Sequence, residues 1–467
     1  MNRRDFLRYS ALAAGTSFLA ACTVQPAGVA KPAAVATNAV ALNDPWLTGL
    51  VAPDLAADFR MMSWEGEGEM RKWLLHINKF FNTYYPNVKQ TIDWGVEWGQ
   101  YWTKLATLLA GGSPLEMVWM HDSRVKSFAS RELLAPLDDY LTAYVPPGWP
   151  DQFYKSQVEA FKWNGKQYAF PYDWAPGGFY INQDLFDQAG LKVPDENATW
   201  DEILDLALKL THDVDDPQKA TWGLGQVGTT QWSAGHYWIV KSFGGDYWTP
   251  DLTKSMMADP KTVQAFQFIR DLEWKHKVQP TSAMVQGLGL TAETAFVSGK
   301  IAMHYGLNDL SFRFGEAIQD KFKWTVAPTP TGPAGRFQFS GGSAWCIPAT
   351  STQKDLAYEL IRYVLSNPEL LPTTATMGGA LVANMDFAKF GLPPAELGIG
   401  DAFQHAFIDL GARDACYPDY HEKYLEWEST AYNNNLDPVW AGEVEDVSIA
   451  LAKADTETQA ILDSMQK

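Results

Sequence analysis

The stretch Phe170–Asn182 has the sequence FPYDWAPGGFYIN, and the interpretation of the whole chain starts from it. Aromatic and branched residues at its two ends predict short strands. The Pro-Gly-Gly sequence at 176–178 interrupts them, because proline fixes φ and lacks an amide donor, whereas glycine opens backbone angles closed to other residues. Such an interruption is typical of a tight loop or of a crossing between two lobes. The helix-rich sequence that follows favours the crossing.

Length and composition bound the class of protein. A chain of 467 residues is too long for one ordinary core, so two globular units are expected. With 46% hydrophobic and 20% charged residues, the chain is predicted to be globular and neither disordered nor membrane-spanning. The formal charge of −18 argues against a nucleic-acid partner, which calls for a basic face, and favours a neutral or cationic ligand. Most of the 20 tryptophans are expected in the core, and any surplus that lines a cleft would suit the apolar faces of sugar rings.

The N-terminus carries the features of an export signal. Arg3 and Arg4 form a twin-arginine pattern, and an apolar run at 9–21 ends in Leu-Ala-Ala-Cys, which is typical of a bacterial lipobox. The run is too short to span a bilayer as a stable helix. We therefore predict a signal peptide at residues 1–21, cleavage before Cys22 and lipidation of its thiol, in preference to a plain amphipathic start.

The residues after the lipobox are predicted to form a flexible lipoprotein tether at 22–55, because they are rich in Ala, Val and Pro and nearly uncharged up to about residue 43. Once Cys22 is lipidated, only Cys346 and Cys416 remain, and the sequence does not say whether they pair.

Strands and helices alternate in the segment that follows the tether. Strand patterns at 59–64, 88–92 and 117–120 are separated by helical periodicities at 70–81 and 101–108, which predicts a parallel α/β sheet. Ligands bind beyond the carboxyl ends of the strands of such sheets. That rule places five residues on one rim: Trp64, Glu65, Trp119, His121 and Asp122.

Each of these residues also has a plain structural interpretation. Glu65 could belong to a solvated acidic helix start, Trp119 to the core, and Asp122 to a helix N-cap. We prefer a ligand role for this rim because the strand-end position coincides with an aromatic neighbour.

The second half is predicted to contain a helix at 184–191, a capping box at Thr199–Glu202 and a helix that begins at Asp259-Pro260. Trp232 and Tyr247 lie beside glycines and polar residues, which is more typical of a cleft wall than of a core. A helix is also expected from about residue 443 to 465.

Five segments, in order, carry a likeness to a known family: 119–122 (W-x-H-D), 171–191 with 199–203, 295–303 (AF-x-x-GK-x-AM), 341–348, and the helix at 356–365. On these motifs the chain resembles the maltose-type extracellular solute-binding proteins of ABC importers. The resemblance implies an α/β fold of two Rossmann-like lobes, joined by three crossings, that close on the ligand by a hinge motion. The implied first lobe is 56–173 with 343–388, and the second is 178–340 with 390–467. The hinges are expected near 173–178, 339–343 and 386–392.

The resemblance also implies ligand contacts. By position they are Trp119 and Asp122 from the first lobe, Tyr172, Asp173, Gly342 and Ser343 near the hinge, and Trp232 from the second lobe. One aromatic residue among Tyr420, Tyr424 and Trp427 is a further candidate contact, with Tyr424 preferred and core packing as the alternative for each. Where the family carries G-x-W after the AM strand, this chain has Gly306-Leu307-Asn308-Asp309, so Asn308 or Asp309 is expected to contact the ligand by hydrogen bonding.

The function implied is capture of a sugar or oligosaccharide outside the cytoplasm and its delivery to a membrane permease. We expect a lipid-anchored monomer with no cofactor and no metal, since no metal-ligand or nucleophile–base spacing is present, and the G-x-G-x-x-G at 223–228 lacks the required setting. Two alternatives remain: a binder of a polyol, peptide or cationic compound, and a surface carbohydrate-active enzyme that uses Asp122 with Asp173.

Overall fold

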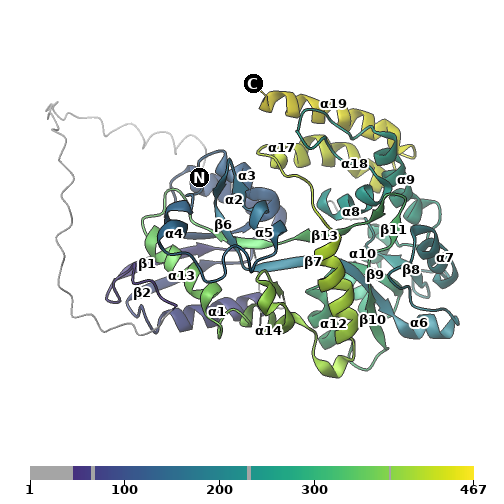
Figure 1. Cartoon of the computed structure of the whole chain (residues 1–467). Helices are drawn as coiled ribbons and strands as arrows, with labels where there is room; N and C mark the ends of the chain where they lie inside the picture. Colours follow the sequence, from purple (N-terminus) through teal and green to yellow (C-terminus); the bar gives the residue numbers. More distant parts are fainter. Residues whose placement is uncertain (1–45, 65–68, 229–232, 378–379, 467) are drawn as a thin grey trace, which may run out of the picture. The chain divides into compact units, whose positions relative to one another are not determined.

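The computed structural model describes residues 46–64, 69–228, 233–377 and 380–466, and Ala41–Lys467 forms one compact unit. The predicted signal peptide and most of the tether, with Arg3, Arg4 and Cys22, lie outside the described residues, as do Glu65 and Trp232. Within the described part, the buried residues gather around two sheets, and we refer to the two groups of elements as the first and second lobes (Figure 1).

The first lobe is built on a five-stranded sheet in the order β2-β1-β3-β14-β6. β1 pairs in parallel with β2 and β3, whereas β14 pairs antiparallel with β3 and β6. The strands are β1 (Ala57–Met62), β2 (Val88–Asp93), β3 (Met117–His121), β6 (Ala169–Pro171) and β14 (Ser343–Cys346). The parallel α/β sheet predicted from the alternation is therefore confirmed for β1, β2 and β3.

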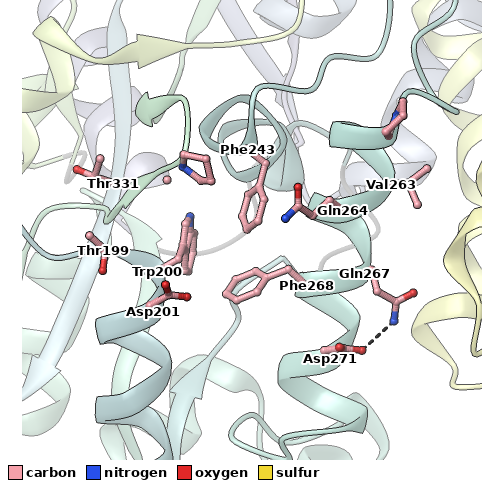
Figure 2. Close-up of a pocket in the computed structure, with 13 residues that line it drawn as sticks. Thr199, Trp200, Asp201, Phe243, Val263, Gln264, Gln267, Phe268, Asp271 and Thr331 are labelled. Carbon is pink, nitrogen blue, oxygen red and sulfur yellow. Dashed lines mark hydrogen bonds between the residues drawn. The ribbon is translucent and has the colours of Figure 1, made fainter.

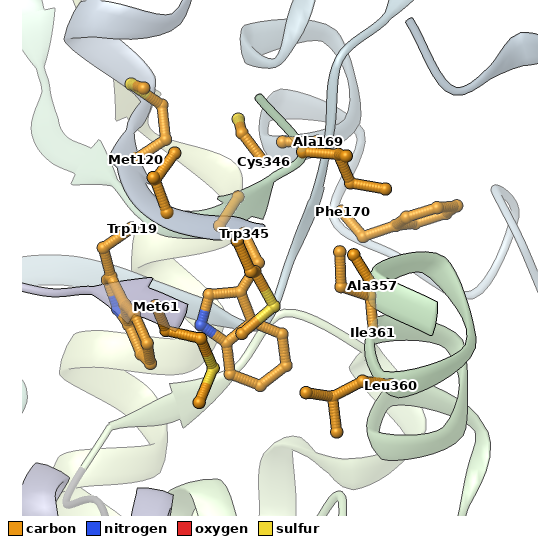
Figure 3. Packing of buried hydrophobic residues seen from close by; sticks show 14 of the residues in the cluster. Met61, Trp119, Met120, Ala169, Phe170, Trp345, Cys346, Ala357, Leu360 and Ile361 are labelled. Atoms are coloured by element: carbon orange, nitrogen blue, oxygen red, sulfur yellow. The ribbon is translucent and has the colours of Figure 1, made fainter. Parts of the chain in front are cut away.

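Helices cover this sheet because their apolar faces supply one continuous core. Figure 3 shows the centre of that core, where Trp345 lies between Met61 and Trp119 on one side and Leu360 of α13 on the other. The helices are α1 (Glu69–Phe81), α2 (Trp98–Ala110), α3 (Asp122–Ala129), α4 (Asp138–Ala143), α5 (Lys155–Ala160), α13 (Lys354–Ser366) and α14 (Thr373–Thr376), with the hairpin β4 (Lys162–Trp163) and β5 (Lys166–Gln167).

The second lobe is built around the long strand β7 (Asp173–Asn182), which pairs with β9, β10, β13 and β15. The other strands are β8 (Trp222–Gly225), β9 (Ile301–Leu307), β10 (Trp324–Ala327), β13 (Gln338–Gly341), β15 (Leu381–Val382) and β16 (Ala415–Cys416), with the hairpin β11 (Thr331–Gly332) and β12 (Gly335–Arg336). Successive residues of β7 face opposite sides of the sheet, so Phe179 and Ile181 enter one core and Tyr180 enters another.

Both faces of this sheet carry helices. On the Phe179 side lie α6 (Gln183–Gln188), α7 (Trp200–Leu210), α8 (Ser233–Phe243), α9 (Pro260–Trp274), α17 (Tyr424–Trp427), η5 (Glu428–Tyr432), α18 (Asn433–Trp440) and α19 (Val447–Met465). On the Tyr180 side lie α10 (Ser282–Gly287), α11 (Ala292–Val297), α12 (Leu310–Ile318), α15 (Gly400–Phe403) and η4 (Gln404–Asp409). The remaining elements are η2 (Met385–Gly391), η3 (Ala395–Leu397) and α16 (Leu410–Arg413). The yellow C-terminal helices α18 and α19 pack with α9, far from them in sequence (Figure 1).

The predicted interruption at 176–178 is wrong as a local structure, because β7 runs through it as one strand. The two glycines have negative φ and are needed for close packing. A Cβ on Gly177 would lie 2.2 Å from the Tyr305 hydroxyl oxygen, and one on Gly178 would lie 2.8 Å from Phe407 Cζ. β9 and β13 pair with β7 on either side and satisfy its backbone through the predicted interruption.

The chain passes between cores at three places. Tyr172 packs in the core of the first lobe, whereas Trp174 packs in the core on the Tyr180 side of the second sheet. Phe339 packs in the second lobe, and Ala344 packs in the first. Further on, Val382 belongs to the first core, whereas Leu392 packs against the core of the Tyr180 side. These passages fall at or beside the three predicted hinges.

Several local predictions are confirmed. Thr199 and Glu202 form the predicted capping box at the start of α7, and Asp259 caps α9 with Pro260 in its first turn. The C-terminal helix begins at Val447, four residues later than expected, because Asp446 caps it. Cys346 and Cys416 are both buried and free. Among the described helices none combines the length and apolar character that a membrane crossing requires.

Candidate functional site

The first element of the site is the end of β3. The His121 side chain accepts a hydrogen bond from the Ser123 backbone amide at 3.3 Å and so caps α3. Asp122 is therefore the first residue of the helix rather than its N-cap, which removes the structural alternative offered for it. The burial of all five β3 residues holds this turn rigidly.

The Asp122 carboxylate is buried without a hydrogen-bond partner among the described residues. Its side chain is 0% exposed, and neither oxygen accepts a hydrogen bond within the described part of the chain. His121 Nδ1 lies 2.8 Å from Oδ1 without the alignment of a hydrogen bond. The Asp122 amide donates to the Gly342 carbonyl at 3.1 Å, and a Cβ on Gly341 would lie 3.4 Å from Oδ2. The carboxylate thus lies at the β13–β14 crossing, where burial of an unpartnered charge is costly unless a ligand supplies donors.

Residues of the second lobe face Asp122. Burial raises the pKa of Tyr417 to about 12, and the nearby Asp122 carboxylate is the next largest cause. Burial also raises the pKa of Tyr420 well above its ordinary value, again with Asp122 as the next cause. The Tyr420 hydroxyl has no hydrogen-bond partner among the described residues. Asp122 therefore lies where the two lobes meet.

The hinge strands bring further predicted residues to this place. An Asp173 carboxylate oxygen accepts a hydrogen bond from the Ser343 amide, which ties two crossings together. Asn308 is buried, its amide N–H donates to the Pro176 carbonyl at 3.1 Å, and both its side-chain amide atoms lack partners in the described structure. Asp309 instead pairs with Arg313 at 2.8 Å and is 38% exposed. Of the two alternatives at this position, Asn308 is the one that reaches the hinge.

Gln157 was missed by sequence reasoning. It lies in α5, is fully buried, and neither amide atom has a partner in the described residues. A Cβ on Gly342 would lie 2.2 Å from its Oε1, so the amide covers the same crossing as Asp122. No motif surrounds it, and its only signal is that the segment precedes the hinge.

A second buried polar cluster adjoins this place. Arg124 of α3 pairs with Glu428 of η5, and Glu428 Oε1 accepts a hydrogen bond from Ser233 Oγ at 2.7 Å. Ser233 also bonds to the Tyr424 hydroxyl, and its carbonyl accepts from the Tyr247 hydroxyl at 2.6 Å. Burial raises the pKa of both tyrosines well above the ordinary value. Tyr247 and Tyr424 are both fully buried, so Tyr247 does not form the expected cleft wall; both tyrosines instead support an ion pair that the sequence did not reveal.

The aromatic residues of the first lobe divide into two groups. Trp119 Nε1 donates to the Tyr172 hydroxyl at 2.6 Å, and both side chains are buried beside Trp345 in the core. The ligand-stacking role proposed for Trp119 is not supported, since no ring face is accessible. Trp64 is half-buried and packs edge-on against Trp98 at 5.1 Å between ring centroids.

Trp98 in turn lies 5.2 Å from the His121 ring, again edge-on. Because Trp64 and Trp98 retain exposed area beside the β3 rim, they are better placed than Trp119 to stack on a ligand.

A separate groove of about 800 Å³ lies wholly on the second lobe (Figure 2). Trp200, Phe243 and Phe268 form its apolar wall, and Gln267 donates to Asp271 at its edge at 2.8 Å. None of the predicted ligand contacts lines it, and its polar groups are accessible to water. No cluster of His, Cys, Asp and Glu suited to a metal occurs in the part of the chain that the structure describes.

Residues 68–369 match the model of a family described as bacterial extracellular solute-binding protein. The chain belongs to this family. A binding protein of Brucella abortus (strain 2308) is 23% identical over 420 residues, which cover 86% of this chain and 93% of the relative. The ABC substrate-binding protein Lmo0181 of Listeria monocytogenes, solved in complex with cycloalternan, has a TM-score of 0.77 at 22% identity and covers 88% of this chain and 100% of its own.

UgpB of Mycobacterium tuberculosis, solved in complex with glycerophosphocholine, has a TM-score of 0.71 at 20% identity, with 89% of this chain and 100% of that chain covered. The solute-binding protein described here therefore shares the two-lobed α/β fold of these structures. The resemblance and the fold class predicted from the motifs are confirmed.

Proposed function

We propose that this solute-binding protein captures a sugar or oligosaccharide between its lobes and delivers it to the permease of an ABC importer. The single observation that carries the proposal is the buried, unpartnered Asp122 carboxylate at the meeting of the lobes. Sugar hydroxyls are neutral donors that would satisfy its oxygens without adding charge. The similarity to a cycloalternan-bound protein supports the same class of ligand.

The surrounding residues offer the other kinds of contact that a sugar makes, namely amide hydrogen bonds and aromatic stacking. Gln157 and Asn308 each offer a donor and an acceptor that have no partner among the described residues, which matches the dual character of a hydroxyl group. Trp64 and Trp98 offer partly exposed ring faces for the apolar side of a pyranose. We propose these five residues, including Asp122, as the binding set, with Tyr420 as a further candidate.

We also propose that the two lobes have the boundaries given above and close on the solute about the crossings near 173–178, 339–343 and 386–392. We also propose that the protein is exported by its twin-arginine signal, anchored through lipid on Cys22 and monomeric. Metabolic labelling with a fatty-acid analogue, compared with Cys22→Ser, tests the anchor: label retained by the variant contradicts it.

A catalytic role is disfavoured by the state of Asp173. The enzyme alternative needs Asp122 and Asp173 as an acid and a nucleophile or base, both free to act on substrate. One Asp173 oxygen is held by the Ser343 amide, so this carboxylate serves the hinge. We therefore propose binding without catalysis. Products released from an oligosaccharide by the wild type but not by Asp122→Asn would contradict this.

A thermal-shift and calorimetry screen tests the ligand class. The panel contains mono- and oligosaccharides, polyols, amino acids, polyamines and glycerophosphocholine, the last because of the similarity to UgpB. The proposal expects saturable binding of a sugar that Asp122→Asn weakens. Binding confined to the non-sugar solutes rejects the sugar assignment and leaves the family membership intact.

A further inference from the structure

The helix α3 of the first lobe packs against α17 of the second, and a buried ion pair joins them. Arg124 lies on α3, whose neighbours Val125 and Phe128 enter the first core. Glu428 directly follows α17, whose Tyr424 and Trp427 enter the core of the second lobe. The Arg124 and Glu428 side chains are 3% and 9% exposed. The two charges therefore come from different lobes and are buried against each other.

We propose that Arg124 and Glu428 form a clasp between the lobes, in which Glu428 positions the Arg124 guanidinium so that its remaining N–H groups bind the solute. This rests on the proposed function. The clasp makes Arg124 a specificity-determining residue and Glu428 a positioning residue that acts only when the lobes are together.

The contacts of Arg124 support this assignment. One Nη donates to Glu428, whereas Nε and the other Nη are buried without a partner in the described residues. The guanidinium also lies over the Tyr424 and Trp102 rings, 5.5 and 5.6 Å from their centroids, so one face is held from each lobe. A guanidinium fixed in this way has two nitrogens, Nε and one Nη, left to donate, and these suit adjacent oxygens of a ligand.

The hydrogen bonds that Glu428 accepts hold its carboxylate, and with it the Arg124 guanidinium, in one geometry. Glu428 Oε1 accepts from Ser233 Oγ at 2.7 Å, and Ser233 is bonded in turn to Tyr424. Both carboxylate oxygens are thus engaged. A buried ion pair contributes to a defined geometry only when its remaining hydrogen-bonding capacity is satisfied in this way.

The charge balance of the cluster bears on the class of solute. Arg124 is neutralised by Glu428, so the buried carboxylates of Asp122 and Asp173 leave the region with an excess of negative charge. Uronic acids and sugar phosphates would add a further anion beside it. We therefore infer that the clasp and Asp122 together select neutral sugars, or amino sugars, over acidic ones.

A second ion pair between the lobes, from α3 to the segment that precedes α17, provides a control. Lys126 and Asp419 are 3.0 Å apart, but their side chains are 24% and 56% exposed. Exposed pairs contribute little because water screens them. Replacing Asp419 with Asn removes one carboxylate charge from a contact with α3, as Glu428→Gln does, but at an exposed site.

The first experiment compares Glu428→Gln with Asp419→Asn by calorimetry and stopped-flow dissociation, using the neutral sugar identified by the screen. Glu428→Gln is expected to weaken binding about tenfold or more, mainly through faster dissociation, because Arg124 is left buried and unpaired. Asp419→Asn is expected to change affinity less than about twofold. Wild-type affinity and dissociation rate in Glu428→Gln would overturn the clasp, as would an equal effect of both variants.

A second measurement separates the clasp from a general structural role and from the identity of the ligand. Spin labels at Leu75 and Ile449, both exposed and one on each lobe, report the distance between lobes in the ligand-free protein. The clasp expects a closed population in the wild type that Glu428→Gln reduces, with no loss of ligand-free thermal stability comparable to a core defect. A wild type without a closed population, or one that the variant leaves unchanged, overturns the clasp even if no solute of the panel binds. If the clasp is found and no sugar binds, only the proposed function fails.

Discussion

Replacing Asp122 with Asn tests the central assignment most directly, because ligand affinity and ligand-free stability should change in different directions. The substitution keeps the volume and one acceptor oxygen and removes the charge. The carboxylate is 0% exposed, and neither oxygen has a hydrogen-bond partner in the described chain. Without ligand, Asp122 therefore bears a desolvation cost that no hydrogen bond in the described chain offsets.

The magnitude follows from the bonds a ligand would make. A hydrogen bond to a charged group contributes about 1.5–3 kcal/mol. At about 1.4 kcal/mol per factor of ten, the loss of one such bond weakens Kd by roughly 10- to 150-fold. Two free oxygens make this a lower bound. In the ligand-free protein the same change removes an unpaired buried charge, so Tm should stay equal or rise.

The assay is calorimetry with the sugar from the screen, beside ligand-free thermal unfolding of the same samples. Asp309→Asn is the control, because Asp309 is an exposed partner of Arg313 and its loss should cost at most about 1 kcal/mol of stability with no effect on binding. Affinity within twofold of wild type in Asp122→Asn would refute the reasoning. A parallel fall of affinity and ligand-free Tm would show instead that Asp122 serves the fold.

Three further predictions concern stability. Gly342→Ala should cost about 1–3 kcal/mol in urea unfolding, because its Cβ would lie 2.2 Å from Gln157 Oε1, whereas Gly99→Ala in α2, with no atom within 4 Å, should be neutral or stabilising; equal effects would contradict this. Burial raises the pKa of Glu273 to about 8, so the folded state favours the protonated form and loses stability as pH rises from about 4.5 through 8. Glu273→Gln should therefore raise Tm more at pH 8.5 than at pH 5. A gain in Tm that does not depend on pH would count against the assignment. Burial lowers the pKa of His304 to about 3, so stability present above pH 6.5 is lost as pH falls toward 3; His304→Phe should flatten that acid limb, and an unaltered slope would exclude His304 as its source.

Much of the architecture followed from local sequence. The alternation of strands and helices predicted the parallel part of the first sheet, and the capping box at Thr199–Glu202 predicted the start of α7. These signals are local because hydrophobic period and cap chemistry act within one element. The ordered motifs then indicated the family that the comparison confirms.

The site was predicted less completely. The strand-end rule brought attention to Asp122, and the structure places it at the meeting of the lobes. The same rule also selected Trp119. This side chain packs into the core because β14 pairs with β3 in the sheet and places Trp345 directly opposite it. The strand that pairs with β3 on this side comes from residues 343–346, more than 200 positions further along the chain. No local pattern near Trp119 indicates which distant strand will pair there.

The sequence by itself determined the class of this protein, many of its α/β elements and the acid at the end of β3. Only the tertiary structure decided that 176–178 continues as a strand, that Gln157 lies over Gly342, and that Arg124 meets Glu428. The physical reason is the range of the interactions. Periodicity and capping are settled among neighbours in the chain, whereas burial of a charge or an amide depends on which distant segment excludes the water, and that is settled only when the lobes pack together.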